Sequence, residues 1–303
     1  MAGAGVNVAY TFVGDYMTSL DMAGCSITVF VLDNELEGYL TAPSQVPSFM
    51  VSELVANSAY APLPADTAPK KGTYTIQTNA SHAKTQNNKL DLNNVTYIVD
   101  LLAKEIIERE DQFSKLDSVA GDGDFGASIA KGFRRLKDEW AHVTTANDIG
   151  DFLENCAMII MEHCGGASGP VWGSAFRGMA KSTAKKSSLD TQAVADMLKA
   201  AVQSIQATGE RSFGRGAVVG DKTLIDALIP CAEQWQKSAK NNDSLKEALQ
   251  KGAKAAKQGA DSTKDIVARM GRAGNVGERS LGHPDAGAQA LAVLFEVIAK
   301  EVE

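Results

Sequence analysis

Cysteine is scarce in this sequence of 303 residues, and its spacing indicates no site. The four cysteines form no Cys-x-x-Cys pair, and no histidine stands at zinc-ligand spacing from them, which argues against a zinc site and a redox motif. Each has apolar neighbours, so we expect buried free thiols in a reducing compartment. The four are Cys25, Cys156, Cys164 and Cys231.

Long apolar runs and an excess of basic residues are missing as well. No apolar run approaches the roughly 18 residues of a membrane-spanning helix, and no basic segment precedes an apolar core at the N-terminus, as in a secretory signal. The net charge of −7 argues against nucleic acid or an anionic membrane as partner, because binding to such surfaces needs a basic field. With 44% apolar and 22% charged residues, we expect a soluble cytoplasmic protein.

The first 89 residues divide into two parts of different composition. Residues 8–14 and 26–32 are rich in β-branched and aromatic residues and are predicted to be strands, with a short helix or turn near 17–22. Five of the eight prolines lie within residues 43–71, and a polar stretch follows, so residues 43–89 are interpreted as a linker. Two strands do not make a stable sheet, so we expect them to pack on the rest of the chain or to pair with a second copy in a homodimer.

After Leu90 the hydrophobic pattern becomes helical. Apolar residues recur at spacings of three and four from Leu92 to Ile106, which predicts an amphipathic helix with one buried face. Seven further stretches repeat this pattern without a convincing strand among them, so residues 90–303 are predicted to form an all-α domain of eight helices. These stretches are 128–140, 148–162, 171–183, 190–206, 221–236, 244–258 and 285–302, with Asp190 and Asp243 as expected N-caps.

Three aspartates lie close together in a glycine-rich junction. Asp117, Asp122 and Asp124 fall within eight residues and would repel one another unless a cation lies among them. Their spacings do not share a helical face, but the interleaved glycines predict a loop that brings the carboxylates together. Carboxylate oxygens favour Mg²⁺, Ca²⁺ or Mn²⁺. The sequence does not match a calcium EF-hand, because the twelfth position counted from Asp122 is Phe133, where an EF-hand has Glu.

Mg²⁺ suits this set best if a nucleotide is the ligand, because Mg²⁺ keeps phosphate oxygens in its shell. A solvated acidic turn that caps a helix beginning near Ala127 is the alternative. Small residues at 165–169 followed by Pro170 would expose backbone N–H groups as a phosphate cradle, or form an ordinary turn between helices. A third junction lies at residues 220–226, where the simplest interpretation of Asp221 is a helix cap.

Four motifs together resemble the signatures of the dihydroxyacetone kinase L domain. They are Gly-Asp-Gly-Asp at 121–124, Gly-Gly-Ala-Ser-Gly-Pro at 165–170, Gly-Asp-Lys-Thr at 220–223 and Gly-Glu-Arg-Ser-Leu-Gly-His-Pro-Asp at 277–285, in the family's order. The resemblance covers residues 90–303. It implies an eight-helix antiparallel barrel that binds ATP or ADP at one end.

The resemblance also implies site residues. Asp117, Asp122 and Asp124 match the family's Mg²⁺ ligands, and Arg272 is expected to offset charge on the transferred phosphoryl group. Departures from the family's usual residues fall at the rim of the nucleotide pocket, at Phe125, Arg215, Gly274, Asn275 and Ala286. The implied contacts to ATP or ADP are Phe125, Gly126, Ala127, Ser128, Ala167, Ser168, Gly216, Thr223, Leu224, Arg272, Asp285, Ala286 and Gly287.

Residues 12–24 resemble the end of the family's other half, the K domain, which holds dihydroxyacetone through a covalent bond to a histidine upstream of this segment. The four histidines, at 82, 142, 163 and 283, lie in the linker or the L domain, so none can be that residue. We therefore expect residues 1–42 to be a K-domain remnant, and a K-type domain or subunit to present the triose.

The expected function is phosphoryl transfer from ATP to dihydroxyacetone or a related triose. Two alternatives stay open: a non-catalytic or regulatory Mg-nucleotide module, and an L domain that serves another acceptor through a partner protein.

Overall fold

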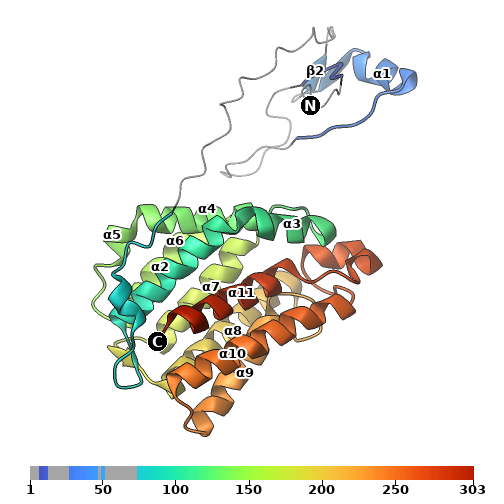
Figure 1. Cartoon of the computed structure of the whole chain (residues 1–303). Helices are drawn as coiled ribbons and strands as arrows, with labels where there is room; N and C mark the ends of the chain where they lie inside the picture. The colour runs from blue at the N-terminus through green and yellow to red at the C-terminus, as the bar shows by residue number, and fades with distance from the viewer. Residues whose placement is uncertain (1–6, 13–26, 47–48, 52–73) are drawn as a thin grey trace. The chain divides into compact units, whose positions relative to one another are not determined.

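The computed structural model describes residues 7–12, 27–46, 49–51 and 74–303, which belong to two compact units (Figure 1). The first unit spans Met1–Lys71 and the second Gly72–Glu303. Within the described ranges, no helix has both the length and the apolar character to cross a bilayer. The cytoplasmic location stays a prediction.

The described residues of the first unit form one helix and one hairpin. Helix α1 is Asn34–Thr41, and the Asp33 side chain caps it by accepting the Leu36 amide at 2.8 Å. Strands β1 (Ser44–Val46) and β2 (Phe49–Val51) pair antiparallel inside the stretch that the sequence predicts to be a linker.

The strands predicted at 8–14 and 26–32 are not observed where the structure describes them, at residues 7–12 and 27–33. A strand requires a backbone ladder with a neighbour, and the only ladder among the described residues of this unit joins β1 to β2. The predicted helix or turn at 17–22 lies outside the described residues. Ile27, Val29, Phe30 and Val31 are exposed, with 80% and 90% of Ile27 and Val31 accessible, so nothing described in this unit covers them.

Eight long helices close into a ring in the second unit (Figure 1). Each packs on the next in the order α2, α4, α6, α7, α8, α9, α10, α11 and back to α2, with successive helices reversing direction. The predicted eight-helix antiparallel barrel is confirmed. The helices are α2 Leu92–Glu108, α4 Phe125–Asp138, α6 Ile149–His163, α7 Ser168–Ser182, α8 Thr191–Phe213, α9 Ile225–Lys240, α10 Leu245–Ser262 and α11 Ala286–Glu301.

Buried aromatic side chains join α4 to α7, which are separated by α6 in the ring order. Phe133 of α4 is fully buried and meets the rings of Trp172 and Phe176 of α7 edge-on, at centroid distances of 6.1 and 6.3 Å. Such pairs contribute about 0.5–1.5 kcal/mol beyond the burial of apolar area. Cys156, Cys164 and Cys231 are free and buried in this core, as predicted, and burial raises the pKa of Cys164 to about 12. Cys25 lies outside the described residues.

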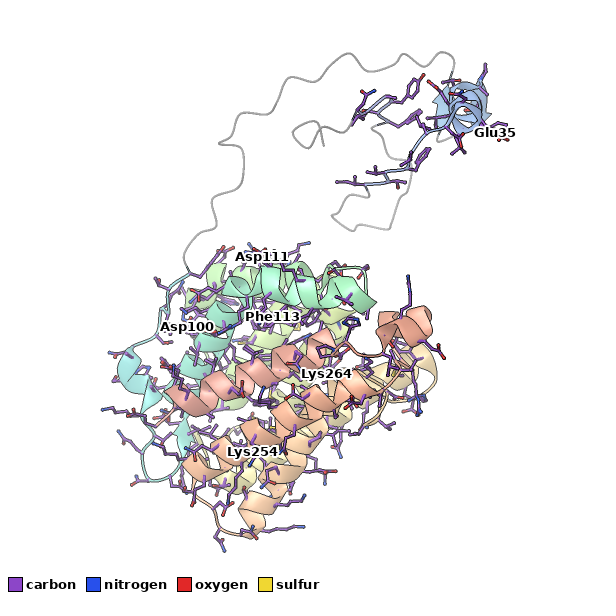
Figure 2. All side chains as sticks on the ribbon, turned by 45° about the vertical axis from the view of Figure 1, so that its right-hand side comes forward. Glu35, Asp100, Asp111, Phe113, Lys254 and Lys264 are labelled. Atoms are coloured by element: carbon purple, nitrogen blue, oxygen red, sulfur yellow. The ribbon has the colours of Figure 1, made fainter. Side chains whose placement is uncertain are left out.

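Two shorter helices, α3 (Glu110–Ala120) and α5 (Trp140–Val143), lie outside the ring order. Helix α3 occupies part of the stretch predicted to be a loop. Its sequence buries only Phe113 and Ala120, so its hydrophobic period is too weak to indicate a helix. Phe113, labelled in Figure 2, packs against Phe125 with ring centroids 6.3 Å apart and so holds α3 on the start of α4.

Residues 74–78 bind the barrel instead of forming a linker. Asp100 of α2, labelled in Figure 2, is fully buried and pairs with Lys137 of α4. The same carboxylate accepts the amides of Gln77 and Thr78 at 2.6 and 2.8 Å, and Lys137 donates to Thr75 O at 3.0 Å. The helical unit therefore begins near Gly72 rather than at residue 90.

The remaining part of that stretch is held at one end of the ring. The 3₁₀ helix η2 (Ala80–Ala83) precedes a backbone pair in which the Thr85 amide donates to Glu303 O at 2.7 Å. Strands β3 (Leu90–Asp91) and β4 (Ser188–Leu189) pair antiparallel beside it.

Four helices begin at this end of the ring, and each has a side-chain cap. The caps of α2, α6, α8 and α10 are Asp91, Asp148, Asp190 and Ser244. The prediction for Asp190 is confirmed. The prediction for Asp243 is wrong, because Ser244 is the N-cap and Asp243 pairs with Lys251 at 2.6 Å.

Candidate functional site

The three aspartates meet at the other end of the ring. Asp117 lies on the last turn of α3, and Asp122 and Asp124 follow in the short junction to α4, so a helix and a loop together position the carboxylates. One carboxylate oxygen from each lies within 4.8 Å of the other two. Asp117 is half-buried and the other two are exposed. This is a set of hard oxygen ligands that could hold one divalent cation.

Backbone geometry fixes Asp117 inside this junction. Its Oδ2 accepts the amides of Gly123 at 2.8 Å and Phe125 at 3.3 Å. Gly123 has a φ of 78°, and a methyl group on Gly121 would lie 2.2 Å from Asp117 Oδ1, so both glycines are needed for this loop. The spacing of acids and glycines in the sequence thus leads to a preformed cluster.

The carboxylates repel one another in the absence of a cation. Burial and the charge of Asp117 raise the pKa of Asp124, while a hydrogen bond with Ser128 acts in the opposite direction. A divalent cation among the three oxygens would remove this repulsion. The residues present therefore fit a magnesium ion.

The helices that begin at this end differ from those at the other end in their capping. Helices α4, α7 and α9 begin without a side-chain cap, after Asp124, Ala167 and Leu224. Only α11 of these four is capped, by Asp285, which accepts the Ala288 amide at 2.8 Å. First-turn N–H groups without an acceptor are donors for anions. The Phe125 amide of α4 already donates to Asp117, and the Ile225 amide of α9 donates to Thr223 Oγ1 at 3.2 Å, so these two amides are taken. Three helix starts and three acidic side chains thus face the same end of the ring.

Two of these starts lie side by side. The Gly165 amide donates to Ser128 O at 3.0 Å, and a methyl group on Gly165 would lie 2.8 Å from Ser128 Oγ. This close approach brings the predicted contacts Phe125, Gly126, Ala127 and Ser128 next to Ala167 and Ser168, where α7 begins.

The junction between α8 and α9 is shaped by buried carboxylates. Asp226 is 1% exposed and accepts the amides of Gly220 and Thr223 at 2.6 and 2.8 Å. Asp221 is not the cap of α9, because it pairs with Arg215 at 2.5 Å and accepts the Val218 amide at 2.9 Å. The pair orders the loop that contains the predicted contact Gly216. No sequence pattern singles out Asp226, which lies one turn inside the predicted helix.

The loop from 263 to 285 completes this end. It contains the 3₁₀ helices η3 (Thr263–Asp265) and η4 (Arg272–Ser280) and leads to the turn at Asp285, Ala286 and Gly287. A methyl group on Gly287 would lie 3.2 Å from Leu224 Cβ, so two of the predicted contacts are neighbours. The side chain of Arg272 lies outside what the structure describes.

Asp285 is half-buried, and its pKa is raised above the ordinary value of an aspartate. Burial raises its pKa to about 7. The Ala288 amide and Lys222 act against this rise, while the charges of Asp226 and Asp117 add to it. Helix α11 and the 3₁₀ helix η4 both contact α3, the helix that carries Asp117, so this loop and the acidic cluster lie at the same end of the ring.

Comparison with known proteins identifies the family of the chain. The DAK2 domain matches residues 119–300, and the Dak1 domain matches residues 1–48. The L-erythrulose kinase of Pectobacterium atrosepticum is 30% identical over 295 residues, 97% of this chain and 48% of that protein. The ADP-binding subunit DhaL of the PEP-dependent dihydroxyacetone kinase of Escherichia coli is 32% identical over 207 residues, 67% of this chain and 95% of that subunit.

A solved structure shares the fold. The crystal structure of the dihydroxyacetone kinase from C. freundii in complex with AMP-PNP and Mg²⁺ aligns with a TM-score of 0.51 and 23% identity, over 89% of this chain and 42% of that one. The chain spans about half the length of the erythrulose kinases it resembles. Because the DAK2 domain matches more than half of the sequence, the chain belongs to the dihydroxyacetone kinase family.

Proposed function

We propose that the helical unit binds a magnesium–nucleotide complex at its glycine-rich end and serves phosphoryl transfer from ATP to a hydroxyl of dihydroxyacetone or a related short ketose. The observation that supports this most is the combination of three uncapped helix starts with a carboxylate cluster. Helix N-termini attract phosphate, whereas carboxylates repel it. A ligand that satisfies both is a polyphosphate with its divalent cation.

Each group at this end has a definable task. Asp117, Asp122 and Asp124 would hold Mg²⁺, which neutralises phosphate charge when bound. The first-turn amides of α4 and α7 would donate to phosphate oxygens. Thr223 and Leu224, beside Gly287, would line the adenine. Arg272 would offset charge on the transferred group. Phosphoryl transfer depends mostly on positioning and electrostatics, so this unit needs no nucleophile of its own.

The acceptor would be presented by a K-type domain or subunit. The match of residues 1–48 to the Dak1 domain supports this partner. The erythrulose kinases that resemble the chain are about twice as long as the chain. The exposed apolar residues at 27–31 offer a surface for such a partner or for a second copy of this chain.

The test is a transfer assay with Mg·ATP and either dihydroxyacetone or L-erythrulose. We expect the chain alone to hydrolyse ATP slowly at most, and to phosphorylate the ketose once a purified Dak1-domain protein is added. Robust kinase activity of the chain alone would refute the assignment of the acceptor site to a partner. Failure to bind Mg·ATP or Mg·ADP in calorimetry would refute the nucleotide site itself.

A second candidate is an ADP-binding subunit of a multi-chain kinase. It is favoured by one observation, that the alignment covers 95% of the E. coli subunit but only half of the single-chain relatives. Dialysis of the nucleotide-loaded chain distinguishes the ATP-using kinase from the ADP-binding subunit. A kinase that uses ATP as co-substrate releases ADP in each turnover, whereas a resident ADP would survive dialysis.

A further inference from the structure

Lys222 combines two unfavourable features. Its side chain is 1% exposed, and its backbone has a φ of 62°, in the left-handed region. That conformation costs an L-residue about 1–2 kcal/mol. Among the described residues, the other non-glycine positions with positive φ are all exposed: Asn87, Asn88, Lys185 and Asn242. A strained, buried lysine at this end of the ring therefore needs a compensating role.

The Lys222 ammonium binds main-chain carbonyl groups of one loop. Its Nζ donates to Ile266 O at 3.0 Å and also to Ser280 O. Both carbonyls belong to the 263–285 loop between α10 and α11, which also contains Lys264, labelled in Figure 2. The carboxylates of Asp226, Asp265 and Asp285 surround the charge and offset part of its burial. Lysine 222 thus joins the start of α9 to both ends of this loop.

Other hydrogen bonds of this loop lie mostly within it. The Gly282 amide donates to Lys264 O at 2.8 Å and the Asp285 amide to Thr263 Oγ1 at 2.9 Å, so its two ends are joined to each other. The Ser280 hydroxyl accepts the Ala268 amide at 2.9 Å and donates to Gly277 O at 2.7 Å, so the loop is closed on itself. Among the described residues, only the Arg269 amide adds a further hydrogen bond to the neighbouring junction, to Asp221 O at 3.0 Å. Lys222 is therefore the main polar link between the two segments in this part of the described chain.

We propose that Lys222 is a positioning residue of the nucleotide site. It fixes the 263–285 loop so that the backbone at Arg272 and the turn at Asp285–Gly287 keep one arrangement beside Leu224. It acts through the loop, without touching the nucleotide. This inference rests on the proposed function only for the identity of the ligand.

The test compares Lys222→Met with a control at the opposite side of the barrel. The control replaces the buried pair by Lys137→Met together with Asp100→Asn, which removes another buried lysine and its partner charge. For Lys222→Met we expect Mg·ADP to bind about tenfold more weakly or worse, the loss expected when a charged hydrogen bond that orders the site is removed. Amide exchange at Ala268 and Arg269 should accelerate while the ring helices stay protected.

The control should lower the midpoint of thermal unfolding and bind Mg·ADP within about twofold of the wild-type chain, because a lost bond distant from a site has little coupling to it. Wild-type affinity in Lys222→Met with unchanged loop exchange would overturn the proposal, as would equal weakening in the control. If Lys222→Met does not fold, Ser280→Ala loosens the same loop and should shift both readouts in the same direction. Amide exchange needs no nucleotide, so it still decides the positioning role if the wild-type chain fails to bind Mg·ADP.

Discussion

Gly123 donates its backbone amide to Asp117 Oδ2 at 2.8 Å, and this bond joins the end of α3 to the loop that precedes α4. It fixes one carboxylate of the acidic cluster while leaving Asp117 Oδ1 for another ligand. The cluster is therefore preorganised, so a cation would find its ligands in place rather than having to order them.

Asp122→Asn should reduce stabilisation by Mg·ADP without destabilising the metal-free protein. We expect wild-type chain to gain about 2.7 kcal/mol of stability when free Mg·ADP is 100 times its dissociation constant. The variant should lose most of this gain and be at least as stable without metal, because it relieves carboxylate repulsion. Thermal unfolding with and without Mg·ADP measures both. Asp138→Asn, at an exposed position at the far end of α4, is the matched control. An unchanged shift in Asp122→Asn would exclude this aspartate as a ligand.

Removal of the cation should weaken nucleotide binding for the same electrostatic reason. In EDTA, the carboxylates of Asp117, Asp122 and Asp124 face the phosphates without a neutralising charge. We expect ADP alone to produce little thermal shift, and Mg²⁺ or Mn²⁺ to restore it. An equal shift by ADP in EDTA and in Mg²⁺ would contradict a metal-bridged mode of binding.

Asp285→Asn should change the pH dependence of stability. The folded pKa is about 7 and the ordinary value 3.8, so the folded state holds the proton more tightly, and the stability that Asp285 contributes is lost as pH rises from about 4 to 7. The full difference corresponds to at most about 4 kcal/mol. Asn cannot ionise but can still cap α11, so the variant should be the more stable protein at pH 8 in EDTA.

Urea unfolding at pH 5 and pH 8 measures this difference. Asp190→Asn exchanges the cap of α8 at the opposite end of the ring and controls for the cap itself. The same decline between the two pH values in Asp285→Asn and in the wild-type chain would show that another group is responsible.

Gly126→Ala should destabilise the protein. The added methyl group would lie 2.0 Å from the Glu110 carbonyl oxygen, where α4 begins against the start of α3. Overpacking of this kind costs about 1–3 kcal/mol. Gly209→Ala in α8 is the control, because its nearest neighbour would be 3.4 Å away and alanine stabilises a helix by up to about 1 kcal/mol. Opposite changes in unfolding midpoint are expected, and equal changes would contradict the close approach.

Truncation should show where the helical unit begins. A chain that starts at Gly72 keeps the bonds from Gln77 and Thr78 to Asp100, whereas one that starts at Leu90 leaves that buried carboxylate with Lys137 alone. Each lost bond to a charged group costs about 1.5–3 kcal/mol. We expect the shorter chain to unfold at a lower urea concentration, and both to retain the acidic cluster. Equal stability would restore the linker interpretation of residues 74–89.

The helices of the ring could be predicted from the sequence, because burial of one face imposes a period of three to four residues that is visible locally. The stripe from Leu92 to Ile106 is an example, and α2 spans Leu92–Glu108. Helix α3 could not be predicted in this way, because only Phe113 and Ala120 are buried along it and they define no clear period. The strands predicted from composition failed for a related reason, because a strand requires a paired neighbour that composition does not specify.

The acidic cluster, too, followed from the sequence, because acids that alternate with glycines in one junction can only be arranged in a few ways. Tertiary structure decided what surrounds it. Lys222 and Asp100 are buried polar residues that bind the main chain of segments distant in the sequence, and no local pattern specifies the partner of such a bond. The sequence therefore determined the ring and the acidic cluster, whereas the hydrogen bonds that fix the loops around them exist only once distant segments are brought together.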